Sequence, residues 1–137
     1  MTFESLKKPS EFSKVYKRGK SFADKNIVVY YMPNQLGITR VGFSISKKVG
    51  NSVVRNRVRR LIRESFRVNF EFVGTYDIIF VARVRSNEVE YHEMTKSLKY
   101  IFRKISISWY KKVYYYEDNF DIDNQILSEI YLTIVGR

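Results

Sequence analysis

Residues 47–67 read KKVGNSVVRNRVRRLIRESFR and hold eight basic residues against one acidic residue, Glu64. On a helical period of 3.6 residues the apolar positions fall on one side, which we expect to pack against the core. This stripe consists of Val54, Val58, Leu61, Ile62 and Ser65, with Phe66 at its margin. The opposite side carries Asn56, Arg59, Arg60, Arg63 and Arg67, with Arg55 and Arg57 at its flanks. A solvated helix usually mixes charges that pair four residues apart, so this uncompensated face predicts a polyanionic partner.

The choice of arginine favours a phosphate-rich partner over a merely solvated surface. A guanidinium group binds two phosphate oxygens at once and stacks on bases, whereas lysine would serve solubility equally well. Gly50, Asn51 and Ser52 precede the helix and predict a turn followed by a side-chain cap. Lys47 and Lys48 lie beside that helix start, where backbone N–H groups also attract phosphate.

Length and charge predict one domain with an extension. The chain has 137 residues and 45% hydrophobic residues, which suits a single globular domain. Its net charge of +11 is uneven, because residues 1–112 carry +15 and residues 113–137 carry −4. We therefore expect a domain over 1–112 and an acidic, aromatic C-terminal extension over 113–137. The extension is expected to be a helix packed on the domain; the alternative is an acidic tail that shields the cationic face.

Composition narrows the class of partner. A strongly basic chain suits nucleic acid or an anionic membrane. No apolar run approaches the roughly 20 residues that span a bilayer, and the start, MTFESLKKPSEF, lacks the apolar stretch of a signal peptide. The absence of cysteine excludes disulfides and thiolate metal sites. We expect a cytoplasmic nucleic-acid-binding protein with neither a membrane partner nor a small-molecule substrate.

The flanking sequence predicts alternating helices and strands. Pro9 opens a short helix that Gly19 ends. Ser86 or Asn87 is expected to cap a last long helix. Strands are expected over residues 26–32, 41–46 and 76–82, and the basic helix over residues 52–72.

Several aromatic residues are candidates for base stacking beside the cationic helix. Phe12, Tyr16 and Tyr30 lie where the first helix and the strands would border it, whereas Tyr31 is expected in the core. The face that Tyr30 occupies is expected to be shared with small residues of the next strand. That set is Gly42, Ser44 and Ser46. A face of this kind is shaped for a ligand backbone.

The residue inventory argues against an active site built by the protein. His92 is the single histidine and is expected at the surface, while Asp77 lacks neighbouring ligands and is expected to form hydrogen bonds at a strand edge. No phosphate-binding glycine loop, nucleophile elbow or carboxylate pair occurs. We expect no catalytic residue and no metal site in the chain.

Four stretches together resemble one family. KKVGNSVVRNRVRRLIRESFR with Arg55-Asn56-Arg57 at its centre, PSEFSKVYKRGKSF, VGFSISKK and YDIIFVAR are similar to the protein subunit of bacterial ribonuclease P over residues 6–104. The resemblance implies a cytoplasmic ribonucleoprotein that removes the 5′ leader from precursor tRNA. In that family the catalytic RNA supplies the active site and binds the Mg²⁺ ions, and the protein lowers the Mg²⁺ requirement. The expected partners are the catalytic RNA and precursor tRNA, and no cofactor is expected on the protein alone.

The resemblance also implies a fold and a set of contacts. The family fold is an α/β (α+β) two-layer sandwich similar to the second domain of ribosomal protein S5, in the order αβββαβα, with a left-handed βαβ crossover. The positions expected to bind the catalytic RNA are Lys47, Lys48, Arg55, Asn56, Arg57, Arg59, Arg60, Arg63 and, on the same face, Arg67. The expected leader-binding cleft contains Phe12, Tyr16, Tyr30, Ser44 and Ser46. Tyr16 stands where many relatives carry Phe, and the acidic extension is not a general family feature.

Two other functions remain open at this point. A ribosomal protein, or another protein that binds structured RNA or DNA without an enzymatic role, would carry a similar basic helix. An autonomous nuclease is opposed by the missing catalytic groups. Competition between duplex DNA and structured RNA distinguishes a protein that places the basic helix in a duplex groove from a ribonuclease P subunit.

Overall fold

A mixed sheet forms the centre of the fold in the computed structural model, which describes residues 2–72 and 74–110. Its strands, in order across the sheet, are β1 (Glu4–Ser5), β4 (Arg40–Ser44), β6 (Tyr76–Ala82), β3 (Ile27–Pro33) and β2 (Lys20–Ala23). Strands β1, β4 and β6 run parallel, and β3 runs antiparallel to both β6 and β2. The extension expected over 113–137 lies outside the described residues.

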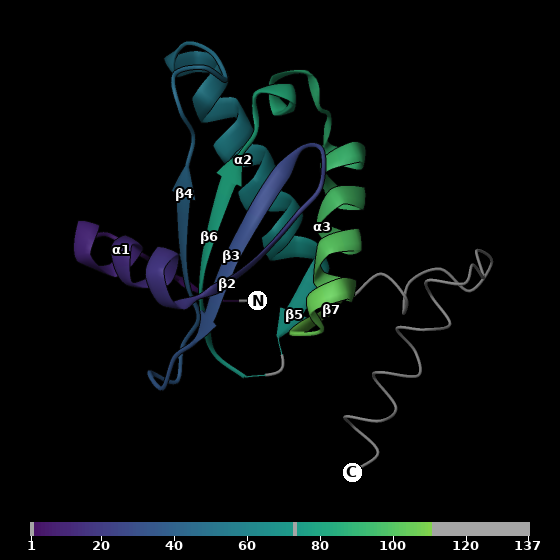
Figure 1. Cartoon of the computed structure of the whole chain (residues 1–137). Helices are drawn as coiled ribbons and strands as arrows, with labels where there is room; N and C mark the ends of the chain where they lie inside the picture. Colours follow the sequence, from purple (N-terminus) through teal and green to yellow (C-terminus); the bar gives the residue numbers. More distant parts are fainter. Residues whose placement is uncertain (1, 73, 111–137) are drawn as a thin grey trace, which may run out of the picture.

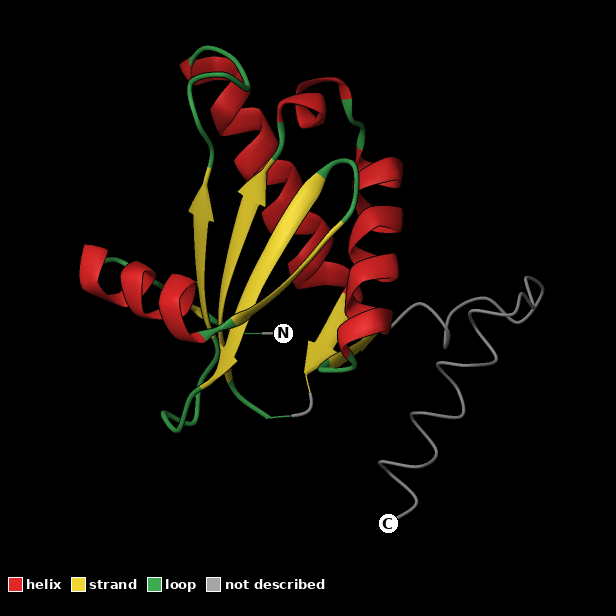
Figure 2. Cartoon of the chain, viewed as in Figure 1, coloured by secondary structure: helices red, strands yellow, loops and turns green. Residues whose placement is uncertain are grey.

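Helices lie on both faces of this sheet (Figures 1 and 2). Helices α2 (Ser52–Asn69) and α3 (Tyr91–Ile105) cover one face and pack against each other. The shorter helix α1 (Pro9–Arg18) lies on the opposite face, where it contacts β3 and β6. A 3₁₀ helix, η1 (Val84–Glu88), precedes α3, and a small second sheet pairs β5 (Phe70–Phe72) with β7 (Ser108–Tyr110).

The crossover from β4 through α2 to β6 is left-handed. In Figure 1 both strands point upward, β6 lies to the right of β4, and α2 passes behind the sheet. Parallel βαβ units are almost always right-handed, so the residue pattern alone does not predict this hand. The α+β sandwich and the order αβββαβα are confirmed by α1, β2–β4, α2, β6 and α3, to which short strands β1, β5 and β7 are added.

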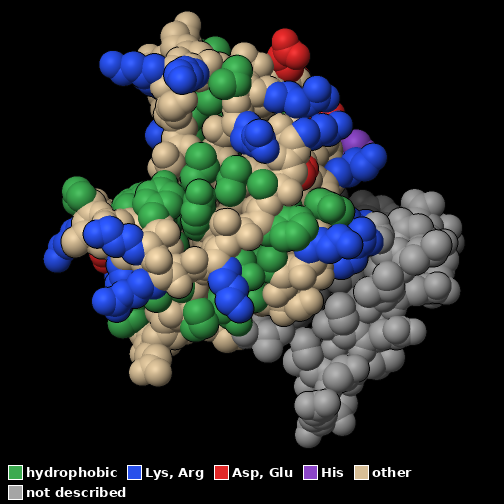
Figure 3. Space-filling view, viewed as in Figure 1, with side chains coloured by type: hydrophobic (Ala, Val, Ile, Leu, Met, Phe, Trp, Pro, Cys, Tyr) green, Lys and Arg blue, Asp and Glu red, His purple; other side chains and the backbone are tan. Residues whose placement is uncertain are grey.

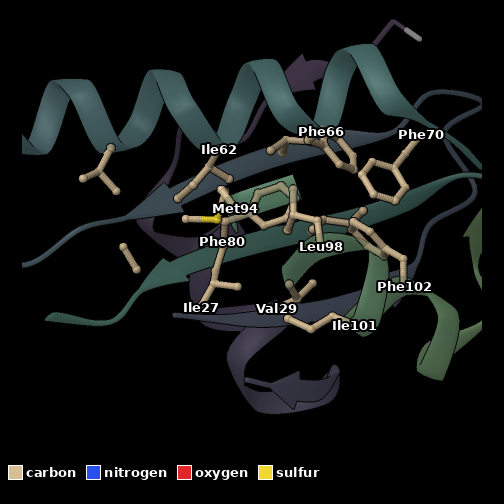
Figure 4. Packing of buried hydrophobic residues seen from close by; sticks show 14 of the residues in the cluster. Ile27, Val29, Ile62, Phe66, Phe70, Phe80, Met94, Leu98, Ile101 and Phe102 are labelled. Carbon is tan, nitrogen blue, oxygen red and sulfur yellow. The ribbon is translucent and has the colours of Figure 1, made fainter. Parts of the chain in front are cut away.

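The apolar stripe of the basic helix builds the core, as expected. Val58, Ile62 and Phe66 are fully buried, and Phe66 packs edge-on against Phe80 of β6 with ring centroids 4.9 Å apart. Figure 4 shows the Ile62 and Phe66 side chains meeting those of β3, β6 and α3. Burying one such side chain contributes about 1.5–3 kcal/mol, so the stripe holds α2 flat on the sheet. Ser65 on the same stripe is buried and hydrogen-bonded to Thr95 of α3 at 2.7 Å.

Two predicted helix boundaries are wrong. The basic helix ends at Asn69 instead of 72, because Phe70 turns into β5, which pairs with β7. Asn69 is buried there and donates to the Ser65 carbonyl and to the Tyr91 hydroxyl, both at 2.8 Å. The aromatic residues after it gain more from packing between strands than from continuing the helix.

The last helix begins at Tyr91, not at a cap formed by Ser86 or Asn87. Ser86 is buried, and its hydroxyl donates to the Arg83 carbonyl at 2.6 Å. Ser86 and Asn87 belong to the 3₁₀ helix η1 instead. The reason is that Val89 is drawn into the core, and its backbone N–H closes the 3₁₀ turn by donating to the Ser86 carbonyl at 3.2 Å.

A polar network fastens α1 to the sheet. Arg40 on β4 donates to both carboxylate oxygens of Asp77 on β6, at 2.8 and 2.7 Å, and also to Glu11 of α1. Asn34 adds a third hydrogen bond to Asp77 at 2.8 Å. Burial opposes ionisation of Asp77, but the hydrogen bonds from Arg40 and Asn34 outweigh it and hold the pKa below its ordinary value. Asp77 therefore has the hydrogen-bonding role expected from the sequence.

We expect Asp77→Asn to lower the free energy of unfolding by about 1–3 kcal/mol at pH 7, because Arg40 then loses its buried carboxylate partner. A lowered pKa means that the carboxylate contributes stability that is complete above its unfolded-state pKa and is lost as pH falls through the folded-state pKa. The difference between wild type and variant should therefore shrink below about pH 4. Urea unfolding followed by circular dichroism at several pH values measures both effects.

Glu64→Gln provides the matched control. Glu64 pairs with Arg67 at the same 2.7 Å, but its side chain is 41% exposed, against 5% for Asp77. An exposed pair contributes less than about 1 kcal/mol. Equal losses in the two variants would contradict the role given to the buried pair.

Candidate nucleic-acid interface

The start of α2 is fixed by a tight turn and a side-chain cap. The Asn51 side chain accepts a hydrogen bond from the Val54 N–H at 3.0 Å, which satisfies one free donor of the first helical turn. A side chain at Gly50 would place its Cβ 2.7 Å from Val54, so only glycine fits. Lys47 and Lys48 precede this turn and are exposed. The predicted arrangement of turn, cap and cations at the helix start is confirmed.

The side chains on the outward side of α2 differ in their exposure to solvent. Asn56, Arg60, Arg63 and Arg67 are exposed, whereas Arg55, Arg57 and Arg59 are half-buried. Among the described residues, neither Arg60 nor Arg63 has a hydrogen bond or ion pair with the protein. These two guanidinium groups are therefore the most available for an external phosphate.

Three of the arginines have partners within the protein. Arg57 donates to the carbonyls of Asn87 and Val89, the latter at 3.4 Å, and so ties α2 to η1. Arg59 donates to the Asn56 side chain at 3.0 Å. Arg67 donates to Glu64, and this hydrogen bond holds the pKa of the Glu64 carboxyl below its ordinary value. Both members of that pair are largely solvated, so Arg67 stays accessible to an external anion.

The predicted cleft residues lie on the α1 side of the sheet. Strand pairing places Gly42, Ile79 and Tyr30 in one row, so Tyr30 shares its face with the small residues of β4, as its alternation predicted. Phe12 of α1 packs on Gly42, where a Cβ would come within 2.5 Å of the ring. Tyr16 is 40% exposed and meets Tyr30 edge-on, with ring centroids 4.9 Å apart.

Next to that aromatic cluster the sheet stays open. The adjacent row contains Ser44, Val81 and Val28, all half-buried, and ends at exposed Ala23 on β2. Ser46 lies beyond the end of β4 and is exposed. Figure 3 shows hydrophobic side chains gathered at the middle of this face, with Lys and Arg side chains around it. An apolar floor with a cationic margin suits an unpaired nucleic-acid strand.

Arg83 and Arg85 at this margin were not predicted from the sequence. Because β4 and β6 are parallel, their carboxyl ends lie at one edge of the sheet, which brings residues 83–85 to the same end as residues 46–48. Both arginines are exposed, and Arg83 also donates to the Asp24 carbonyl at 3.2 Å. Their position directly after a buried strand is the sequence signal that could have identified them.

The chemistry of this interface suits contacts with a nucleic acid. Its side chains offer guanidinium and ammonium donors for phosphate oxygens, and rings for stacking. Within residues 2–72 and 74–110, no group of three acidic or histidine side chains is placed to hold a metal ion. No helix in that part of the chain is long and apolar enough to cross a membrane.

Comparison with known proteins identifies the family. The family model for ribonuclease P matches residues 1–106. The ribonuclease P protein component of Clostridioides difficile is 48% identical over 107 residues, covering 77% of this chain and 94% of that relative. The corresponding protein of Thermoanaerobacter sp. strain X514 is 52% identical over 100 residues, covering 72% and 86%.

Solved structures agree with this assignment. The RNase P protein of Staphylococcus aureus, solved at 2.0 Å, superposes with a TM-score of 0.70 at 33% identity and covers 77% of this chain and 98% of that one. The RNase P protein of Thermotoga maritima gives a TM-score of 0.61 at 26% identity, covering 69% and 91%. The fold, the basic helix and these relatives lead to one conclusion: the chain belongs to the ribonuclease P protein component family.

Proposed function

We propose that the chain binds the catalytic RNA of ribonuclease P through the outward face of α2 and holds the 5′ leader of precursor tRNA in the cleft beside α1. The observation that carries this proposal is the pair of unpartnered arginines, Arg60 and Arg63, on a helix whose other side is locked into the core. The RNA subunit performs the cleavage and binds the Mg²⁺ ions, in the cytoplasm. The protein acts as an accessory subunit of this endoribonuclease.

Charge neutralisation gives the α2 face its role. Folded RNA brings phosphates close together, and their repulsion must be screened by metal ions or by protein cations. Fixed guanidinium groups supply part of that screening without any loss of ion entropy. The protein should therefore lower the Mg²⁺ concentration at which the RNA folds and cleaves.

The cleft gives preference for substrate over product. Only the precursor carries a leader, so stacking on Tyr16 and Tyr30 adds affinity for precursor and none for mature tRNA. Rings and phosphate contacts read little base identity, so the leader contacts should tolerate many sequences.

The way α2 is seated disfavours a duplex reader. A helix that enters a major groove must project from its domain, whereas Val58, Ile62 and Phe66 bury one whole side of α2 against the sheet. A helix lying flat on a sheet suits the irregular surface of structured RNA better.

Cleavage of precursor tRNA tests the assignment directly. With a bacterial ribonuclease P RNA at low Mg²⁺, the rate of precursor-tRNA cleavage should be higher in the presence of the full chain than in its absence. High Mg²⁺ should make the RNA independent of the protein, which serves as the control. A protein that leaves the low-Mg²⁺ rate unchanged would contradict the proposed function.

Removing the two unpartnered arginines should weaken RNA binding through the electrostatic term. For Arg60→Ala together with Arg63→Ala, we expect the negative slope of log affinity against log salt concentration to become shallower by about 1.4. Each phosphate contact to a single strand contributes about 0.7 to the size of this slope. Binding of the catalytic RNA over a salt series measures this slope. The control is Lys7→Ala with Lys25→Ala, which removes two exposed cations away from α2. Identical slopes in the two double variants would exclude Arg60 and Arg63 as phosphate contacts.

Loss of the exposed Tyr16 ring should weaken the binding of precursor tRNA but not that of mature tRNA. Tyr16→Ala should weaken holoenzyme binding of precursor tRNA by about 1–3 kcal/mol, the value of one base stacked on an aromatic ring, with mature tRNA unaffected. Tyr16→Phe retains the ring and should bind both RNAs normally. The proposal for the cleft fails if Tyr16→Ala weakens precursor and mature tRNA equally.

A further inference from the structure

We propose that Arg57 is a positioning residue, which holds η1 against α2 so that Arg85 meets the same catalytic RNA as the outward face of α2. Arg57 acts through this segment and does not itself bind phosphate. The inference rests on the proposed function, which makes the catalytic RNA the partner of α2. It changes the role that the family motif implies for the second arginine of Arg55-Asn56-Arg57.

The Arg57 guanidinium group is already engaged by the protein. One terminal nitrogen donates to the Val89 carbonyl at 3.4 Å, and the other donates to the Asn87 carbonyl. The last carbonyls of a helix lack partners within the helix, and a cationic side chain can satisfy them. Arg57 is also half-buried. The pair of nitrogens that would bind two phosphate oxygens end-on is therefore occupied.

The same hydrogen bonds join two elements that are far apart in sequence. Arg57 lies 30 and 32 residues from its two acceptors. Within residues 2–72 and 74–110, it is the one α2 side chain that hydrogen-bonds to the segment from η1 to Val89. In Figure 1 this segment lies between the upper end of β6 and α3, and it contacts α2. Loss of the Arg57 side chain would therefore release η1 from its hydrogen bonds to α2.

Arg85 is the cation that η1 presents. It is exposed, and among the described residues it has no hydrogen bond or ion pair. Glu88 and Glu90 follow within η1 and at the start of α3, but neither forms an ion pair with Arg85 in that part of the chain. The parallel strands β4 and β6 bring η1 to the edge where exposed Lys47 and Lys48 precede α2. Arg85 is therefore available to a phosphate at the same edge as these lysines.

The position of η1 decides how much this guanidinium group contributes to binding. A charged side chain on a fixed segment meets a phosphate without ordering that segment, whereas a loosened segment must first be ordered. The start of η1 is held by the Ser86 hydroxyl, which donates to the Arg83 carbonyl at 2.6 Å. Its end is held by Arg57 and by the burial of Val89. The contribution of Arg85 to RNA affinity should therefore depend on Arg57.

A double-mutant cycle on the binding of catalytic RNA to the full chain tests this dependence. Arg85→Ala should weaken binding roughly three-fold in the wild-type chain, the size of one exposed charge contact. In the Arg57→Ala chain the same change should have almost no effect, because Arg85 is no longer held in place. Arg60→Ala is the matched control. In that background Arg85→Ala should still cost its full factor, since the two arginines contact RNA independently.

Amide hydrogen exchange of the free protein measures the positioning itself. Arg57→Ala should speed exchange of the Ser86 and Val89 N–H groups, whose acceptors are the carbonyls of Arg83 and Ser86. Arg60→Ala should leave both rates unchanged. If Arg57→Ala does not fold, Arg57→Lys replaces it in both measurements. Lysine keeps the charge but lacks the planar fork that reaches both carbonyls, so the same two results are expected.

Three results would overturn the role given to Arg57. They are an equal cost of Arg85→Ala with and without Arg57, no effect of Arg85→Ala in the wild-type chain, and exchange rates that are unchanged in the Arg57 variant. An Arg57 that only stabilises the fold, or that contacts RNA directly, gives the first of these. The proposed function stands in each case if Arg60→Ala with Arg63→Ala still weakens RNA binding, and it fails separately if that double variant has no effect.

Discussion

Burial of one side of α2 is the constraint on which the rest of the molecule depends. Phe66 lies at the centre of it, in contact with rings from β6, α3 and the small second sheet. Because this side is buried, the opposite side must face solvent whatever its charge. The arginines are thereby displayed at fixed positions on a rigid element, which is how a binding surface is held in register with its ligand. The same packing sets the path of the chain between the two parallel strands, and so the edge where the cations gather.

Periodicity predicted those features that rest on burial. The 3.6-residue repeat identified the buried and exposed sides of α2, and alternation placed Tyr30 on the face of Gly42 and Ser44. These predictions succeed because a helix or strand presents its side chains at fixed angles. The handedness of the crossover and the order of the strands depend on contacts far apart in sequence. The family resemblance supplied the handedness, and the residue pattern did not.

Predictions failed where side-chain contacts outweighed local preference. Asn69 continues a helical pattern, yet the helix ends there, where its side chain donates to the Tyr91 hydroxyl of α3 and Phe70 turns into β5. Arg57 reads as one more cation of the face, but its guanidinium bonds the carbonyls before α3. For the same reason the candidate site is known in outline from the sequence and in detail only from the fold. A motif gives residue types and spacing, whereas the availability of each side chain depends on its neighbours.

The unpaired arginines of α2 also bear on how long the protein survives. Like charges held about one helical turn apart repel, so the free protein carries a destabilising term that disappears when phosphates bind. By mass action, a ligand that binds only the folded state increases its stability, here by an amount set by the RNA concentration. Under the proposed function, protein without RNA would spend more time unfolded and would be cleared faster by proteases. The cationic face would then link the amount of protein in the cell to the amount of RNA available to it.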